Sequence, residues 1–368
     1  MKRRYKRKNI AAIRIRLWNA HNMRRRRRVK DKAKYIRIQR NKRKKVKYRR
    51  ERSNITYYSN HNRTLVAPSR FSLLEYPEDV IGFINKIENL LSENVKVKSI
   101  MFELHDITSI DIGAVCLLLS KLNELSRKRI QNWGTLPKDQ KCRKFIEESG
   151  FLDRMRDMSS GSPFSRKNKN LILNRGFDKT DNAATAKEIR KAVEHITGKQ
   201  GYFKPIYSIA QEICANSVEH ANEKIYKKNW LFSSSYLNDE VVFTMTDIGD
   251  GILKTLKRKL VKQIQDGLFK DSVDVLVNAF EKQYESRTQD PNRNKGLPKI
   301  YKVSSEKYIK NLIVVTNNVF LDFDNPEKSK MLRNTFKGTF YYWILNKECM
   351  GHRTKRILRI ERKEYQTY

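Results

Sequence analysis

From about residue 64 to residue 348 the chain alternates short apolar runs with longer amphipathic stretches. The run VKSIMFEL (97–104) indicates a buried strand, and AVCLLLSKLNELSRK (114–128) has the spacing of a helix with one apolar face. Strands that alternate with helices bury their apolar faces against one another in layers. The pattern therefore predicts an α/β fold.

Residues 1–52 differ from the rest of the chain in charge. They contain 26 Lys and Arg and two acidic residues, whereas the whole chain has 79 Lys and Arg against 40 Asp and Glu. Like charges at this density repel, so we expect a basic, largely disordered arm over residues 1–53. Its natural partners are polyanions, with nucleic acid ahead of an anionic membrane surface, and a merely solubilising tail is the remaining alternative.

Composition also suggests domain boundaries after the arm. We expect a small α/β domain over residues 54–158, a polar and basic linker over 159–170, and a second α/β domain over 171–350. A basic tail, residues 351–368, follows. Within the second domain, WLFSSSYL and DEVVFTMTD read as strands joined in a hairpin, and GTFYYWIL reads as the last strand, beginning at Gly338.

The cysteines and the hydropathy pattern bear on location. The four cysteines form no CxxC pair and have no histidines at zinc-ligand spacing, so we expect reduced thiols rather than disulfides or a metal site. The longest apolar run is too short to cross a bilayer. These features favour a cytoplasmic protein without a transmembrane segment.

The segment QEICANSVEHAN (211–222) places Glu212, Asn216 and His220 four residues apart, so all three share one face of an expected helix. Taken alone, this stripe is more typical of a solvated helix face than of a binding site. Its meaning depends on the segments that come later in the chain.

Two later segments favour a binding site. TMTDIGDGI (244–252) puts Asp247 at the end of a strand, followed by glycines that let a backbone approach a ligand closely. NRNKGLPKI (292–300) opens a helix, whose first amide groups and dipole favour phosphate. Each segment is a weak signal by itself, and their order along the chain is the stronger one.

Together with GTF (338–340), these segments resemble the GHKL ATPase superfamily over about residues 171–348, and NSVEHA is most similar to its anti-sigma-factor serine-kinase branch. The resemblance implies an α/β sandwich, a mixed sheet covered by helices, that binds ATP with Mg²⁺. The roles it implies are Glu212 as general base, Asn216 as Mg²⁺ ligand, His220 near the phosphates, Asp247 as acceptor of the adenine amino group, Gly249 and Gly251 in the nucleotide wall, Lys295, Gly296 and Leu297 in the phosphate loop, and Thr339 beside Asp247. The loop departs from the family's Gly-x-Gly-Leu in having Asn294 first.

The preceding segment, about residues 64–157, resembles a STAS domain, the fold of anti-sigma-factor antagonists. In that family a phosphorylatable serine lies in a turn before a helix, and here the turn reads Ile110-Asp111-Ile112-Gly113. The resemblance, without that serine, implies a docking or regulatory module with a fixed negative charge at a helix N-terminus.

These observations lead us to expect a Mg²⁺- and ATP-binding regulatory ATPase, with ATP or ADP as ligand, nucleic acid bound through residues 1–52, and a protein partner for the STAS-like segment. The alternatives are an anti-sigma-factor-like interaction protein, in which turnover is irrelevant, and a Ser/Thr protein kinase. The intact Glu212 favours catalysis, and Asn294 favours binding without efficient turnover. A homodimer is compatible with the sequence.

Overall fold

The computed structural model of the chain describes residues 62–92, 97–155, 164, 171–176, 182–219, 230–259, 271–281 and 296–351. The basic arm, almost all of the expected linker and the basic tail lie outside these residues, so the expectations for them stay predictions. Residues 61–368 belong to one compact unit.

The first part of the described chain is a three-stranded parallel sheet with the order β1-β3-β5. Parallel neighbours need crossover connections, and α2 and α3 lie within these two connections. A separate parallel pair joins β2 to β4. The elements are β1 (Asn62–Val66), β2 (Arg70–Phe71), α2 (Pro77–Ser92), β3 (Ser99–Glu103), β4 (Ser109–Ile110), α3 (Ile112–Arg127), β5 (Gln131–Gly134), α4 (Gln140–Glu148) and the short 3-10 helix η1 (Phe151–Arg154).

Asp111 is the N-cap of α3, in agreement with its expected place at a helix N-terminus. One carboxylate oxygen accepts a hydrogen bond from the backbone amide of Ala114 at 2.7 Å. The other oxygen accepts from the Ser72 hydroxyl and the Leu74 amide, both at 2.8 Å. The side chain thus caps the helix and ties it to the segment before α2.

The second part of the described chain is a five-stranded sheet with the order β6-β7-β8-β10-β9. Every described pair in it is antiparallel, so the expectation of a mixed sheet was wrong. The reason is that β7–β8 and β9–β10 are joined by short turns, which only antiparallel neighbours permit. The elements are β6 (Leu171–Gly176), α5 (Asn182–Thr197), α6 (Lys204–Glu219), β7 (Trp230–Tyr236), β8 (Glu240–Asp247), α7 (Ile252–Lys259), α9 (Ser272–Phe280), α10 (Gly296–Ser305), β9 (Lys310–Asp322), the 3-10 helix η2 (Pro326–Lys328) and β10 (Lys330–Asn346).

The last strand is longer than expected. β10 begins at Lys330 rather than at Gly338, and its register against β9 shifts between Phe336 and Thr339. Gly338 has a φ of +138° at this irregularity, a conformation that side chains with a Cβ rarely adopt. The glycine that suggested a strand start therefore marks a bulge inside a long strand.

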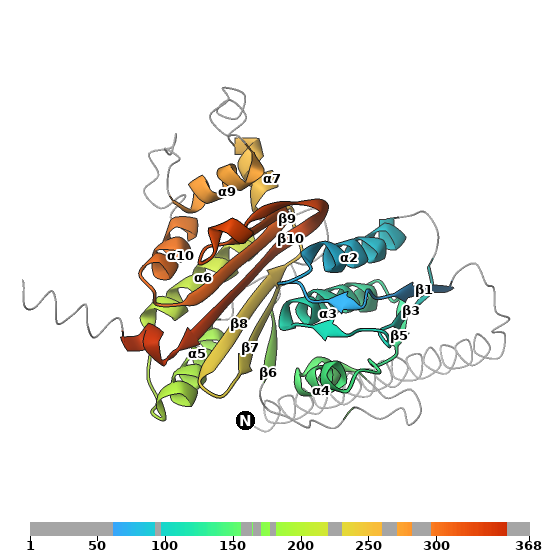
Figure 1. Ribbon diagram of the computed structural model, residues 1–368, viewed down its shortest axis with the longest axis horizontal. Coiled ribbons are helices and arrows are strands. Elements are labelled where there is room, and N and C mark those ends of the chain that lie inside the picture. Colours follow the sequence, from blue (N-terminus) through green and yellow to red (C-terminus); the bar gives the residue numbers. More distant parts are fainter. Residues whose placement is uncertain are drawn as a thin grey trace, which may run out of the picture. The chain divides into compact units, whose positions relative to one another are not determined.

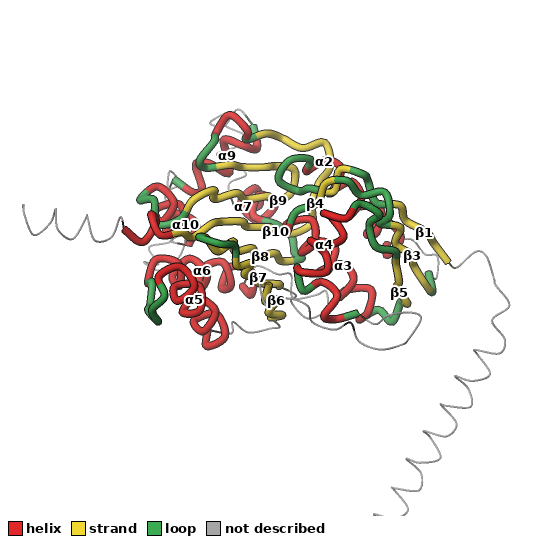
Figure 2. The backbone as a smooth tube through the Cα atoms, turned by 60° about the horizontal axis from the view of Figure 1, so that its bottom comes forward, coloured by secondary structure: helices red, strands yellow, loops and turns green. Residues whose placement is uncertain are grey.

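Helices α5, α6, α9 and α10 pack on one face of the five-stranded sheet (Figure 1). Figure 2 shows α5 and α6 side by side near β7 and β8. Ile206, Ile209 and Ile213 are fully buried on the sheet side of α6. On the strands, the rings of Phe243 and Trp343 stack with their centroids 5.6 Å apart. We call this cluster the helix-side core.

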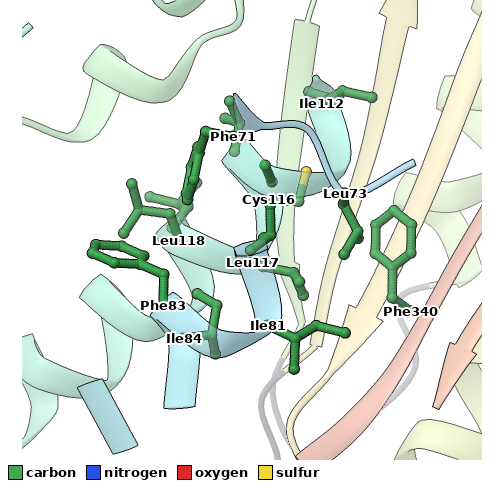
Figure 3. Close-up of a cluster of buried hydrophobic side chains, with 14 of the residues drawn as sticks. Phe71, Leu73, Ile81, Phe83, Ile84, Ile112, Cys116, Leu117, Leu118 and Phe340 are labelled. Atoms are coloured by element: carbon green, nitrogen blue, oxygen red, sulfur yellow. The ribbon is translucent and has the colours of Figure 1, made fainter. Parts of the chain in front are cut away.

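Helices α2 and α3 cover the opposite face of the same sheet. Their apolar side chains and those of the sheet form one continuous cluster, which we call the shared core. Figure 3 shows Leu73 beside Phe340, which comes from β10. The Cys116 thiol of α3 is 3.3 Å from the Thr244 hydroxyl on β8. On its other side α3 contacts β5, so it lies between the two sheets.

Two expectations about the chain as a whole can be compared with the structure. All four cysteines are free thiols and all are buried, as expected for a chain without disulfides. Among the described residues, no helix has the length and apolar character needed to cross a membrane.

Candidate functional site

Helix α6 carries two of the three residues of the polar stripe. Its apolar residues hold it against the sheet, and Cys214 Sγ lies 3.8 Å from Met245 Sδ on β8, two residues before Asp247. Glu212 and Asn216 are half-buried on this helix. His220 lies just beyond the described residues, so its expected role stays a prediction.

The first residue of α10 lies directly against these two side chains. A Cβ added to Gly296 would be 3.3 Å from both terminal atoms of the Asn216 amide and 3.3 Å from Glu212 Oε2. Contacts of that length are tighter than ordinary van der Waals packing, so glycine lets the helix start close to α6. The structure therefore brings together Glu212, Asn216 and Gly296, which are far apart in the sequence.

Its neighbours in the expected phosphate loop differ in their surroundings. Leu297 is half-buried and packs against the helix-side core, so part of its role is to hold α10 on the sheet. Lys295 and Asn294 lie outside the described residues, and their expected roles stay predictions.

Lys299 was not singled out from the sequence. Its Nζ lies 2.5 Å from Glu212 Oε1, in an ion pair between α10 and α6. The signal that could have found it is helical spacing, because Lys299 lies three residues after Gly296 and therefore on the same side of α10.

A row of three polar side chains crosses the end of the five-stranded sheet. Asp247 on β8 pairs with Thr339 on β10, which pairs with Thr316 on β9. Asp247 Oδ1 accepts a hydrogen bond from the Thr339 amide at 3.1 Å. Successive residues of a strand point to opposite faces of the sheet. Asp247 and Thr339 each lie two residues from a side chain of the helix-side core, so this row lies on the same side of the sheet as α6. Thr339 thus supports Asp247 through its backbone, and Gly338 must be glycine because an added Cβ would lie 2.1 Å from the Asp247 carbonyl oxygen.

The loop after β8 is held by β9. Thr316 Oγ1 accepts from the Ile252 amide at 2.9 Å and donates to the Gly338 carbonyl at 3.0 Å. Asn317 Nδ2 donates to the Asp250 carbonyl at 2.8 Å. Thr316 and Asn317 were not singled out from the sequence, because nothing in the local pattern indicates these contacts.

Of the two loop glycines, Gly251 has a clear structural requirement. Its φ is +77°, and an added Cβ would lie 2.5 Å from Asn317 Oδ1. Gly249 is half-buried in the same loop, between β8 and α7.

Two buried polar atoms near this region have no hydrogen-bond partner among the described residues: Asn216 Nδ2 and the Tyr341 hydroxyl. Tyr341 lies one row below Thr339 on the same face of the sheet, opposite Met245. Burial, and then the charge of Asp247, raise the pKa of its hydroxyl, which therefore stays protonated. Buried polar atoms are normally satisfied, so each of these two atoms is a point at which a water molecule or a ligand would supply a hydrogen bond.

The oxygen atoms of Asn216 and Glu212 can be compared with the ligands that Mg²⁺ requires. No group of three or more His, Cys, Asp or Glu side chains suited to a metal occurs in the part of the chain that the structure describes. Mg²⁺ bound with a nucleotide takes one or two protein oxygens and completes its shell with phosphate and water. An amide oxygen on Asn216 beside the Glu212 carboxylate fits that smaller requirement.

The chain was compared with known proteins. No family model matches it, and no curated protein matches it in sequence. Interpretation of the site therefore depends on its geometry and on the sequence resemblance described above.

Proposed function

We propose that residues 171–350 bind Mg²⁺·ATP as a regulatory ATPase of the GHKL type. The observation that carries the proposal is that the start of α10 lies against Glu212 and Asn216 of α6. Helix α6 in turn packs beside β8, the strand that ends in Asp247. A phosphate at this point would meet helix amides, an ammonium and a metal-binding oxygen together.

The adenine base would lie at the other end of the ligand, beside Asp247. Asp247 keeps one carboxylate oxygen on the Thr339 amide. Its second oxygen would accept a hydrogen bond from the amino group of adenine, and the buried hydroxyl of Tyr341, on the same face of the sheet, would contact the base directly or through water.

The chemistry follows from the remaining residues. Asn216 would hold Mg²⁺, which when bound neutralises phosphate charge. Glu212 would orient a water molecule and accept its proton as that water attacks the terminal phosphate. Slow hydrolysis or phosphotransfer to a protein hydroxyl would both use this arrangement.

Nucleotide binding is tested by calorimetry with ATP and ADP, with and without Mg²⁺, on wild type and Asp247→Asn. The asparagine can still accept the Thr339 amide, but its NH₂ group repels the adenine amino group. We expect about a hundredfold loss of affinity for Asp247→Asn, equivalent to about 3 kcal/mol, and an unchanged melting temperature. Absence of nucleotide binding by the wild type would refute the proposal.

Turnover is tested separately. ADP release by wild type and by Glu212→Gln distinguishes a catalytic protein from an anti-sigma-factor-like interaction protein in which ATP is only bound. We expect the variant to lose at least about a hundredfold in rate while still binding nucleotide. Binding without Glu212-dependent turnover would favour the interaction protein, and transfer of labelled phosphate to a protein would favour the kinase.

We also propose that the basic arm, residues 1–52, binds nucleic acid, from its 26 basic and two acidic residues. If six to ten phosphates are contacted, affinity should fall by about 10³–10⁵ between roughly 50 and 200 mM salt. Binding that ignores salt, or survives deletion of the arm, would contradict this. Anionic vesicles in the same assay separate a membrane surface from nucleic acid.

A further inference from the structure

The ion pair between Lys299 and Glu212 lies where water reaches it. The two side chains are 44% and 28% exposed. Water screens an ion pair of this exposure, so the pair adds little to the stability of the fold. Lys299 can therefore exchange its partner without disturbing either helix.

The backbone on both sides of the pair is well held. Gly296 fixes the start of α10 against Asn216, and Ile300 is fully buried in the helix-side core. Lys299 lies between these two anchors, so its stem starts from a defined position while its ammonium group can move. A phosphate bound near the start of α10 would lie within reach of that ammonium group.

We propose that Lys299 makes the site selective for a nucleoside triphosphate over a diphosphate, by leaving Glu212 for the terminal phosphate. This inference rests on the proposed nucleotide-binding function and adds a residue that determines which nucleotide state is recognised. A terminal phosphate carries more charge than one carboxylate and competes for the ammonium group. A diphosphate offers no group at that position and leaves the ion pair intact.

The exchange also couples recognition to Glu212. In the structure, Lys299 occupies Glu212 Oε1. The ammonium group therefore competes with water for one of the two oxygens that Glu212 offers. When Lys299 moves to a terminal phosphate, Glu212 is released beside the phosphate on which it would act. Without that phosphate, Glu212 stays paired.

The test is the ratio of ATP affinity to ADP affinity, measured on the full chain by calorimetry with Mg²⁺. We expect wild type to prefer ATP, and Lys299→Gln to lose about tenfold in ATP affinity while its ADP affinity changes little. Lys302→Gln is the matched control, because Lys302 is an exposed lysine on the same helix. Its ratio should equal that of wild type. Glu212→Gln should tighten ATP binding, because Lys299 then has no competing partner.

The outcomes separate this inference from the proposed function. A wild type that binds neither nucleotide overturns both. A wild type that binds ATP, together with a Lys299→Gln variant that keeps the full preference or weakens both nucleotides equally, overturns only the role of Lys299. Melting temperatures of the three variants within about 2 °C of wild type, the shift that about 1 kcal/mol produces in a protein of this size, exclude unfolding as the cause.

Discussion

Lys121 of α3 and Glu88 of α2 form an ion pair that is buried between the two sheets. Only 1% of Lys121 and 8% of Glu88 is exposed. The second Glu88 oxygen accepts from Lys337 of β10 at 3.2 Å, and Lys121 also pairs with Glu124 at 3.4 Å. The network therefore links the first part of the chain to the last strand of the second.

Lys121→Met should lower the free energy of unfolding by about 3–5 kcal/mol, because it leaves a buried carboxylate without its nearest partner. Urea denaturation measures the loss. Lys128→Met is the control, since Lys128 pairs with Glu124 on the same helix but is 40% exposed. It should cost less than about 1 kcal/mol. Equal effects of the two variants would mean that burial of the pair has no energetic role.

Residues 171–368 produced without the preceding segment should expose the sheet face that α2 and α3 cover. Phe340 is fully buried and Tyr342 is 8% exposed in the shared core. We expect such a fragment to aggregate or to bind a hydrophobic dye, because an apolar face of this kind is unstable in water. A monomeric fragment that binds no dye and melts cooperatively would show that the two parts are independent domains.

Gly251→Ala should destabilise the protein by about 2–4 kcal/mol, from a strained φ and a clash with Asn317. Gly198→Ala is the matched control, because Gly198 has a similar φ of +71° but open space around it. The control should cost only the backbone term, about 1–2 kcal/mol. Equal losses for both alanine variants would contradict the contact.

Cys116 should make stability depend on alkaline pH. Burial raises the pKa of its thiol from 9.0 to about 11. Because the pKa is raised in the folded state, the stability that depends on the protonated thiol is complete below pH 9.0 and is lost as the pH rises towards 11. The loss is about 1.4 kcal/mol per unit across that window. Wild type should therefore lose more stability than Cys116→Ala in denaturation measured on both sides of it. Parallel losses in the two proteins would show that another group titrates.

Part of the fold could be predicted from the sequence. Apolar periodicity located the helices and strands around α3, α6, β7 and β8, because each of these elements has a face that must be buried. Periodicity did not show that the five-stranded sheet is antiparallel, or that β10 begins at Lys330. Both depend on pairing between strands, which a single strand does not encode.

The candidate site divides in the same way. Glu212, Asn216, Asp247 and Gly296 have recognisable residue types at recognisable spacings, and the structure brings Gly296 against the first two. Lys299, Thr316 and Tyr341 have no such local signature. Each matters only through a group that folding brings beside it: a carboxylate for Lys299, a loop amide for Thr316 and the charge of Asp247 for Tyr341.

By itself the sequence determined the α/β class and the concentration of basic charge in residues 1–52, and it named the candidate site residues, because these depend on local pattern and charge. Only the tertiary structure decided that α2 and α3 complete the back of the second sheet, and that Lys299 neutralises Glu212. Both are contacts between segments far apart in the chain: the first is stabilised by the burial of apolar side chains, and the second depends on a proximity that exists only after folding.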